Sequence, residues 1–383
     1  MEFSFYTANK IVFKQGAIAE LGSHVKSLGT NFLVVVDPFF LTSPTMDVVK
    51  SQLESIGAAY TVFGEVSGEP TVEQIDEVAK LALKNGCNAV ISIGGGSCID
   101  AGKATAALLT NGTPAIDYME VVGKGKKVTV MPAPFIAVPT TAGTGSEVTK
   151  NAVLGSSVLN FKRSMRSDTM VANVAILDPL LTVGCPPKVT ANSGIDAATH
   201  LIESYLTWRA TPISDGLAMS GIELIGKYLR KAYDNGNDIE AREGMCAASL
   251  IGGMAFANSG LGAVHGIGMA VGIAFHVPHG EACGILLPHI MKLNAPHALE
   301  RTARIGELLT GKRFDTQKQA ADAAVDFVFE LCDHMNIAPD YKHLGIPKER
   351  IPQLAKESFG TSMSSNPVQL TPEQWEEFLS TVV

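Results

Sequence analysis

The sequence of 383 residues predicts an α/β domain with a parallel sheet, followed by an all-α domain. In the first half, short runs rich in β-branched residues alternate with helical segments, the order expected of a parallel sheet covered by helices. After the Pro186-Pro187 pair, strand-like runs nearly vanish and long segments rich in alanine and leucine follow. We therefore assign residues 1–184 to the α/β domain and residues 185–383 to the helical domain.

Each predicted strand is an apolar run that stops at a turn residue. Such continuous runs are typical of parallel strands buried on both faces. The predicted strands of the first domain are 32–36, 60–63, 89–93 and 135–138, and the predicted helices among them are 46–56, 71–85 and 98–109. The second domain is predicted to contain helices at 190–207, 214–232, 239–257 and 318–335.

The composition excludes several classes of protein. With 46% hydrophobic and 18% charged residues, the chain is not disordered, collagen-like or a coiled coil. The net charge of −8, without blocks of Lys and Arg, argues against nucleic acid as a partner. The uncharged stretch 249–275 is long enough to span a bilayer, but its glycines and His265 favour a buried helical region. We expect no signal peptide, no membrane association, reduced cysteines and a cytoplasmic location.

A glycine-rich turn predicts a phosphate-binding loop. Gly94-Gly95-Gly96-Ser97 follows one predicted strand and precedes a predicted helix. Glycines let a ligand approach the backbone closely, and the free N–H groups at a helix start attract an anion. Ser97 adds a hydroxyl donor, and Asp100 can cap the first turn. The alternative is a glycine-rich turn that only packs tightly.

This loop differs from the common dinucleotide fingerprint GxGxxG, and no acidic residue for the ribose follows at the usual distance. Asp37, at the end of an earlier strand, is the candidate for that role; the alternative is a turn residue that ends the strand before proline. A second polar loop, 139–147, is expected at the same edge of the sheet as the glycine loop. Its hydroxyls suit phosphate or amide recognition, although such loops are also common as plain turns.

Four residues of the second domain form a candidate metal site. Asp196 and His200 are four residues apart and share one face of a predicted helix. His265 and His279 are too far apart to meet on one helix, but a break at Val277-Pro278 would let the second imidazole fold back. One carboxylate and three imidazoles suit Fe²⁺ or Zn²⁺, with a position open for substrate. The alternative is a set of core histidines beside an acid near a helix N-terminus.

These motifs identify a resemblance to the iron-containing (group III) alcohol dehydrogenases, the family that includes lactaldehyde reductase and propanediol dehydrogenase. The resemblance covers nearly the whole chain. It is carried by the segments 13–17, 94–97, 139–144, 177–179, 194–197, 200–203, 279–280, 286–288 and 366–367. It implies the fold shared with dehydroquinate synthase, in which a dinucleotide-binding α/β domain precedes a helical metal-binding domain.

The resemblance also implies the site residues. The metal falls on Asp196, His200, His265 and His279. The resemblance and the glycine loop together indicate the residues around the cofactor. These are Asp37, Gly95, Gly96, Ser97, Asp100, Thr140, Thr141, Thr144 and Lys162. A carboxylate at position 37 would bind the adenosine ribose and repel a 2′-phosphate, so NAD is expected rather than NADP.

The implied reaction is the NAD(H)-dependent oxidation of a small alcohol or diol and the reverse reduction of an aldehyde. The substrate hydroxyl would bind Fe²⁺, or Zn²⁺ as the alternative, and form a metal alkoxide. Hydride would then pass from the carbinol carbon to the nicotinamide. The expected partner is a small alcohol or aldehyde, and the expected assembly is a homo-oligomer, either a dimer or larger.

The sequence departs from the family pattern at several positions. Met269 stands where many members carry a histidine near the nicotinamide and the metal, and His276 is the nearby replacement for a proton relay. The alternative for His276 is a structural role. Glu69 stands where asparagine is common, and Glu281 and Cys283 stand where apolar residues and asparagine are common. The last change is expected to alter the pocket or the surroundings of the metal.

Four alternatives compete with an active dehydrogenase. A non-reducing enzyme similar to dehydroquinate synthase would carry a different set of metal ligands. A metal hydrolase would leave the glycine loop and Asp37 unexplained. A family member with an impaired proton relay, or a binding protein that has lost activity, would be consistent with Met269.

Overall fold

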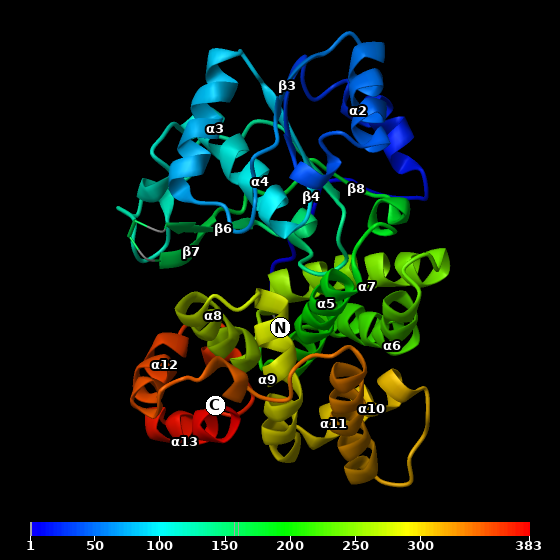
Figure 1. Cartoon of the computed structure of the whole chain (residues 1–383), viewed down its shortest axis with the longest axis vertical. Helices are drawn as coiled ribbons and strands as arrows, with labels where there is room; N and C mark the ends of the chain where they lie inside the picture. Colours follow the sequence, from blue (N-terminus) through cyan, green and yellow to red (C-terminus); the bar gives the residue numbers. More distant parts are fainter. Residues whose placement is uncertain (1, 157, 160) are drawn as a thin grey trace. The chain divides into compact units, whose positions relative to one another are not determined.

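The computed structural model describes residues 2–156, 158–159 and 161–383, and the chain forms two compact units (Figure 1). The first, called here the α/β unit, comprises Phe5–Thr141 and Gly145–Thr182. The second, called the helical unit, comprises Val183–Val383 together with Ala142–Thr144 and the start of the chain. Each unit is described by itself below.

Within the described residues, the α/β unit contains a six-stranded parallel sheet in the order β1-β8-β5-β4-β2-β3 and a separate antiparallel hairpin, β6-β7. The strands are β1 Ile11–Phe13, β2 Asn31–Val36, β3 Ala59–Phe63, β4 Ala89–Gly94, β5 Phe135–Pro139, β6 Asn151–Ser156, β7 Phe161–Arg166 and β8 Val174–Leu177. The predicted strands correspond to β2, β3, β4 and β5, so the parallel α/β sheet is confirmed. The hairpin and the edge strand β1 were not predicted.

Helices cover both faces of the parallel sheet (Figure 1). Their bounds are α1 Leu21–Val25, α2 Pro44–Ser55, α3 Val72–Lys84 and α4 Gly96–Asn111. Alternate residues of a strand point to opposite faces. On β4, Ile91 belongs to the core shared with α1 and α2, whereas Ser92 points to the other face, beneath α4. A Cβ at Gly102 would lie 1.8 Å from the Ser92 hydroxyl oxygen, so a glycine is required for α4 to pack this closely.

The helical unit is built around one buried helix. Its helices are α5 Pro187–Leu206, α6 Pro212–Asp234, α7 Ile239–Ser259, α8 Ala263–Phe275, α9 His279–Asn294, α10 Leu299–Thr310, α11 Gln317–His334, α12 Ile351–Ser358 and α13 Pro372–Val382. Helix α5 packs against α6, α7 and α9, and its residues from Gly194 to Leu206 are all buried. The predicted helices correspond to α5, α6, α7 and α11, which confirms an all-helical second half.

The uncharged stretch 249–275 forms the end of α7 and the whole of α8. The two helices are bent by 102° at the break between Ser259 and Ala263, and more than half of the residues in each are buried. Among the described residues, no single helix has the length and apolar composition needed to cross a membrane, and only this bent pair passes by length and composition.

Candidate metal centre

Three imidazoles of the helical unit surround one carboxylate oxygen. Oδ1 of Asp196 lies 3.8 Å from Nε2 of His200, 3.6 Å from Nε2 of His265 and 3.6 Å from Nε2 of His279. The His279 side chain is 27% exposed, and the other three are buried. The structure thus brings together the four residues that the sequence predicts as metal ligands.

Helices α5 and α8 supply three of these side chains. On α5, Asp196 and His200 are four residues apart and therefore lie on one face of the helix. His265 lies in the first turn of α8, and its ring stacks on that of His200 with 4.6 Å between the ring centres.

The fourth side chain depends on the break between α8 and α9, which falls where the sequence predicted it. Helix α8 ends at Phe275, His276 adopts a left-handed conformation with φ of 55°, and α9 begins at His279. The first turn of α9 approaches the backbone of α5 so closely that a Cβ at Gly280 would lie 2.1 Å from the carbonyl oxygen of Asn192. A glycine after His279 is therefore required for this imidazole to reach the cluster.

The outer ring nitrogens of two histidines are held by acceptors. Nδ1 of His265 donates to Oε2 of Glu203 at 2.6 Å, and Oε1 of Glu203 accepts the N–H of Val264 at 2.7 Å. Nδ1 of His200 lies 3.3 Å from the carbonyl oxygen of Gly143. Since carboxylates and carbonyls only accept, both Nδ1 atoms carry hydrogen and both Nε2 atoms face Asp196.

Glu203 is a residue of this centre that the sequence analysis missed. The signal was present, because Glu203 follows Asp196 by seven residues and His200 by three, which places all three on one face of α5. Its partner His265 is 62 residues away in sequence, so only the packing of α8 against α5 shows the pairing.

The buried atoms of the cluster fit a metal ion. Oδ1 of Asp196 and Nε2 of His265 are both buried, and neither has a hydrogen-bond partner among the described residues. Buried polar atoms are nearly always satisfied, so two such atoms facing each other indicate a ligand. The donor set, one carboxylate and three imidazoles, is the kind that binds Fe²⁺ or Zn²⁺.

The buried groups of the cluster keep Asp196 ionised and His200 neutral. Burial alone would raise the pKa of Asp196, but the imidazoles of His200, His279 and His265 outweigh it and lower the pKa. Burial lowers the pKa of His200 to about 4, which keeps this ring neutral and able to bind a cation. Burial also opposes the charge on His265, but the carboxylates of Glu203 and Asp196 raise its pKa to about 9.

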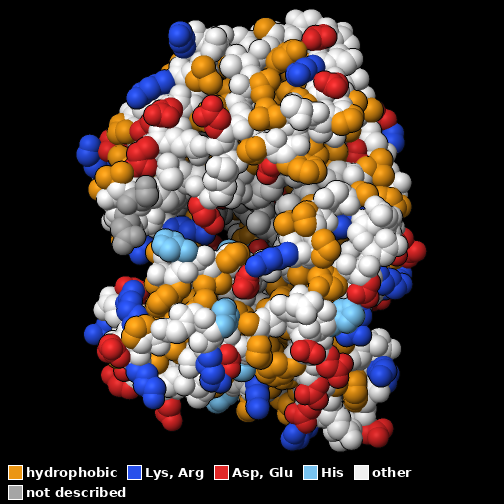
Figure 2. Space-filling model, viewed as in Figure 1, with side chains coloured by type: hydrophobic (Ala, Val, Ile, Leu, Met, Phe, Trp, Pro, Cys, Tyr) orange, Lys and Arg blue, Asp and Glu red, His pale blue; other side chains and the backbone are white. Residues whose placement is uncertain are grey.

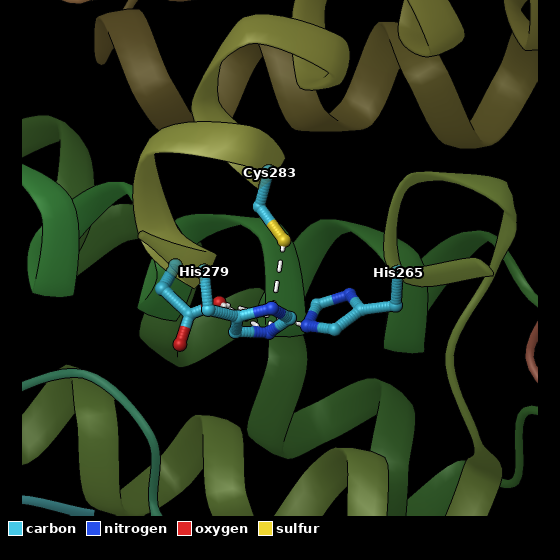
Figure 3. Close-up of side chains that lie close together, drawn as sticks. His265, His279 and Cys283 are labelled. Carbon is cyan, nitrogen blue, oxygen red and sulfur yellow. Dashed lines mark hydrogen bonds and ion pairs between the residues drawn. The ribbon is translucent and has the colours of Figure 1, made fainter. Parts of the chain in front are cut away.

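A sulfur atom also belongs to this cluster. Cys283 lies on α9, one turn after His279, and its Sγ is 3.8 Å from Nε2 of His279. The candidate ligand atoms of Asp196, His265, His279 and Cys283 all lie within 4.8 Å of one another. Figure 3 shows the side chains of His265, His279 and Cys283 converging on one point from α8 and α9.

In the α/β unit, the two predicted polar loops emerge together, as expected. Strands β4 and β5 are neighbours, with Gly94 opposite Pro139, and the N–H of Thr140 donates to the carbonyl oxygen of Gly94 at 3.0 Å. Gly95 caps α4, and a Cβ there would lie 3.5 Å from the hydroxyl oxygen of Thr141. The helix then begins with Gly96 and Ser97, so its free N–H groups lie at this edge of the sheet.

The two aspartates predicted near the cofactor have structural partners. Asp37 ends β2 beside the glycine loop, and its carboxylate accepts the N–H of Phe39 at 2.9 Å, so it does cap a turn. The carboxylate of Asp100 accepts hydrogen bonds from the Ser146 hydroxyl and, at 2.9 Å, from the N–H of Val153. The bond from Val153 ties α4 to the hairpin strand β6, and burial raises the pKa of Asp100.

The remaining predicted residues lie in three places. Lys162, on β7, forms an ion pair with Glu69, with 2.7 Å between Nζ and Oε1. Thr144 lies in the segment Ala142–Thr144, which belongs to the helical unit. His276 is exposed at the end of α8 and is not one of the rings around Asp196.

A unit with a parallel sheet and a glycine loop, followed by a helical unit with an Asp–His₃ cluster, fits a metal-dependent dehydrogenase. Comparison with protein families identifies the class. Residues 8–179 match the family described as iron-containing alcohol dehydrogenase, and residues 190–383 match the C-terminal part of the Fe-containing alcohol dehydrogenase family. The chain therefore belongs to the iron-containing alcohol dehydrogenases, a family of oxidoreductases.

Individual relatives agree with this assignment. The chain is 35% identical to the NAD-dependent methanol dehydrogenase of Bacillus methanolicus, over 95% of each chain. Its structure matches that of 1,3-propanediol oxidoreductase with a TM-score of 0.95 and 30% identity, over 100% of each chain. It also matches the sulfoacetaldehyde reductase of Bifidobacterium kashiwanohense, solved with NAD⁺, with a TM-score of 0.89 and 32% identity, over 100% of this chain and 99% of that one.

Proposed function

We propose that this protein is an NAD(H)-dependent, metal-dependent alcohol dehydrogenase that oxidises a small alcohol or diol and reduces the corresponding aldehyde. The observation that carries the proposal is the buried cluster around Asp196, in which Oδ1 of Asp196 and Nε2 of His265 lack hydrogen-bond partners among the described residues. Residues 1–184 would form the dinucleotide-binding domain, and residues 185–383 would form the metal-binding domain.

The proposed metal ligands are Asp196, His200, His265 and His279. Fe²⁺ is supported by the family to which the chain belongs, and Zn²⁺ suits the same donors. When bound, such a cation supplies a Lewis acid for the oxygen of the substrate. The protein positions the ligand atoms for this cation. Asp196 contributes the negative charge, and Glu203 orients the ring of His265.

NAD is the proposed cofactor, because one relative is named NAD-dependent and a similar structure contains NAD⁺. Gly95, Gly96 and Ser97 would bind its pyrophosphate at the N-terminus of α4. Asp37, beside this loop, would accept from the adenosine ribose and disfavour the 2′-phosphate of NADP. The other residues proposed around the cofactor are Asp100, Thr140, Thr141, Thr144 and Lys162.

His276 is proposed to take part in proton exchange between the site and solvent. Its exposed position at the end of α8, three residues before His279, suits a group that must reach water. Met269, four residues after His265 on the same helix, cannot carry a proton.

The proposed setting is a homo-oligomer, a dimer or larger, in the cytoplasm, with no nucleic acid or membrane partner. On the face drawn in Figure 2, Lys and Arg side chains are scattered among Asp and Glu rather than gathered into one basic surface, which supports the part of the proposal that concerns nucleic acid.

The test is reconstitution of the metal-free protein with Fe²⁺ or Zn²⁺ while NADH absorbance is followed against short alcohols, diols and aldehydes. We expect metal-dependent absorbance changes with at least one substrate. Asp196→Ala should lose bound metal and turnover together. An absence of change with every metal and substrate would contradict the proposal, and turnover without net change in NADH would favour a non-reducing enzyme instead.

A further inference from the structure

We infer that Cys283 is a further donor of the metal centre, so that the site combines imidazole, carboxylate and thiolate ligands. This inference rests on the metal site proposed above and extends its ligand set beyond Asp196, His200, His265 and His279. Three observations carry it: the position of the sulfur atom, its confinement by the neighbouring helix, and the buried atoms that face it.

The position of Cys283 follows from the helix that also supplies His279. The two residues are four apart on α9, so they lie on one face and one turn from each other. Sγ of Cys283 is 3.8 Å from Nε2 of His279 (Figure 3). The thiol therefore lies among the ligands rather than on the far side of the helix.

The distances agree with binding of one ion. With five donors, neighbouring ligands of Zn²⁺ subtend about 90–110° at the ion, so two nitrogen or oxygen ligands lie about 2.9–3.4 Å apart and a nitrogen and a sulfur ligand lie about 3.1–3.6 Å apart. In the cluster, Oδ1 of Asp196 lies 3.6 Å from His265 and His279 and 3.8 Å from His200, and Sγ of Cys283 lies 3.8 Å from His279 and within 4.8 Å of the ligand atoms of Asp196 and His265. The separation between the sulfur and His279 thus exceeds the metal-bound range by a few tenths of an ångström, as the separations of the nitrogens from Asp196 do.

The sulfur is also confined. Cys283 is fully buried, and α8 passes so close that a Cβ at Gly268 would lie 3.3 Å from Sγ. In addition, Oδ1 of Asp196 and Nε2 of His265 are buried in the same cluster without hydrogen-bond partners among the described residues. These two atoms point to a ligand independently of the cysteine.

A thiolate at this centre changes the choice of metal. Soft sulfur ligands favour Zn²⁺ and Co²⁺ over Fe²⁺ more strongly than carboxylate and imidazole do. When the thiol binds, its proton is released to solvent. We therefore expect this chain to take up Zn²⁺ in preference to Fe²⁺ more strongly than a variant with asparagine at position 283, the residue that is common there in the family.

The experiment uses the full-length protein loaded with Zn²⁺ and examined by X-ray absorption, with metal content measured separately. Wild-type protein is expected to show a sulfur neighbour at about 2.3 Å from zinc. Cys283→Asn is expected to lose it and retain only nitrogen and oxygen neighbours. Cys332→Ala is the matched control, because Cys332 is a buried thiol 3.5 Å from the carbonyl oxygen of Gly284 but lies outside the cluster.

Two further readouts do not depend on activity. With Co²⁺, wild type and Cys332→Ala should show a near-ultraviolet thiolate-to-cobalt band that Cys283→Asn lacks. In competition between equal amounts of Fe²⁺ and Zn²⁺, the ratio of bound zinc to bound iron should fall about tenfold in Cys283→Asn, because the variant lacks the soft thiolate that favours zinc.

The outcomes separate this inference from the proposed function. One zinc ion per chain with only nitrogen and oxygen neighbours in wild type would overturn the role of Cys283 and leave the proposed metal site intact. Absence of metal uptake by wild type would overturn both. If Cys283→Asn does not fold, the sulfur neighbour and the cobalt band of wild type still decide the question, and their absence overturns it.

Discussion

Replacement of Glu203 by glutamine tests whether this buried carboxylate orients the metal centre. Its two oxygens accept from Nδ1 of His265 at 2.6 Å and from the N–H of Val264 at 2.7 Å. Glu203→Gln keeps the size of the side chain but leaves one acceptor and turns an N–H₂ group toward one of the two donors. If the amide oxygen accepts from His265, the ring loses its charged partner. If the N–H₂ group faces His265 instead, the ring loses its acceptor and its fixed orientation. In either case Nε2 of His265 is held less firmly toward Asp196.

The magnitude follows from the kind of hydrogen bond that is lost. Carboxylates that hold the outer nitrogen of a metal-binding histidine typically contribute 10–100-fold in metal affinity, or about 1.4–2.7 kcal/mol. Both oxygens of Glu203 are engaged and buried, and buried hydrogen bonds to charged groups are worth about 1.5–3 kcal/mol. We therefore expect Zn²⁺ affinity to fall about 100-fold, at the upper end of this range.

The assay is a titration of metal-free protein with Zn²⁺ against a chromophoric chelator of known affinity. Glu240→Gln is the matched control, because Glu240 is an exposed carboxylate on α7 that accepts one hydrogen bond, from the Tyr228 hydroxyl. Circular dichroism of the metal-free variants reports any loss of fold. A Glu203→Gln protein that is folded and binds Zn²⁺ within twofold of wild type would refute the orienting role.

Three further predictions concern other groups. Asp37→Asn keeps an acceptor for the N–H of Phe39 but removes the charge, so the ratio of kcat/KM with NAD to that with NADP should fall about tenfold or more; an unchanged ratio would exclude Asp37 from cofactor choice. His276→Asn, which tolerates the left-handed conformation at this position, should change the pH dependence of kcat, and an unaltered profile would remove His276 from proton exchange. Burial raises the pKa of Glu147 to about 7 from its ordinary value of 4.5, so the folded state keeps its proton while the unfolded chain ionises. The free energy of unfolding of wild type should therefore fall by on the order of 3 kcal/mol between pH 4.5 and 7, relative to that of Glu147→Gln. Urea unfolding followed by circular dichroism measures this difference. Parallel pH profiles of the unfolding free energy for the two proteins would contradict the prediction.

The strands that could be predicted from the sequence are those whose apolar residues form a continuous run because both faces of the strand are buried. Strands β2 and β4 are buried on both faces, so their apolar runs predict them directly. The hairpin strand β7 has the sequence FKRSMR and is mostly half-buried, and such a polar, partly exposed strand carries no comparable signal. Edge strand β1 is only three residues long, too short for any periodicity.

The same distinction applies to the metal centre. Asp196 and His200 could be paired from the sequence because helix geometry fixes their spacing, and His279 could be added because the break at Pro278 is a local feature. The contact between Glu203 and His265 depends on how α8 packs against α5, which no local pattern encodes. Cys283 lies one turn from His279, yet a cysteine in an apolar helix is more often a plain core residue.

The three helices that supply the proposed ligands also bear on how fast a metal ion could leave. Asp196 and His200 are fixed on α5, which is buried along most of its length, and His265 is held by Glu203. Only His279 is partly exposed, in the first turn of α9 just after the left-handed His276. Exchange with solvent would therefore proceed by fraying of that single turn, and the lifetime of the bound ion would be set by the opening rate of the α8–α9 junction rather than by affinity alone.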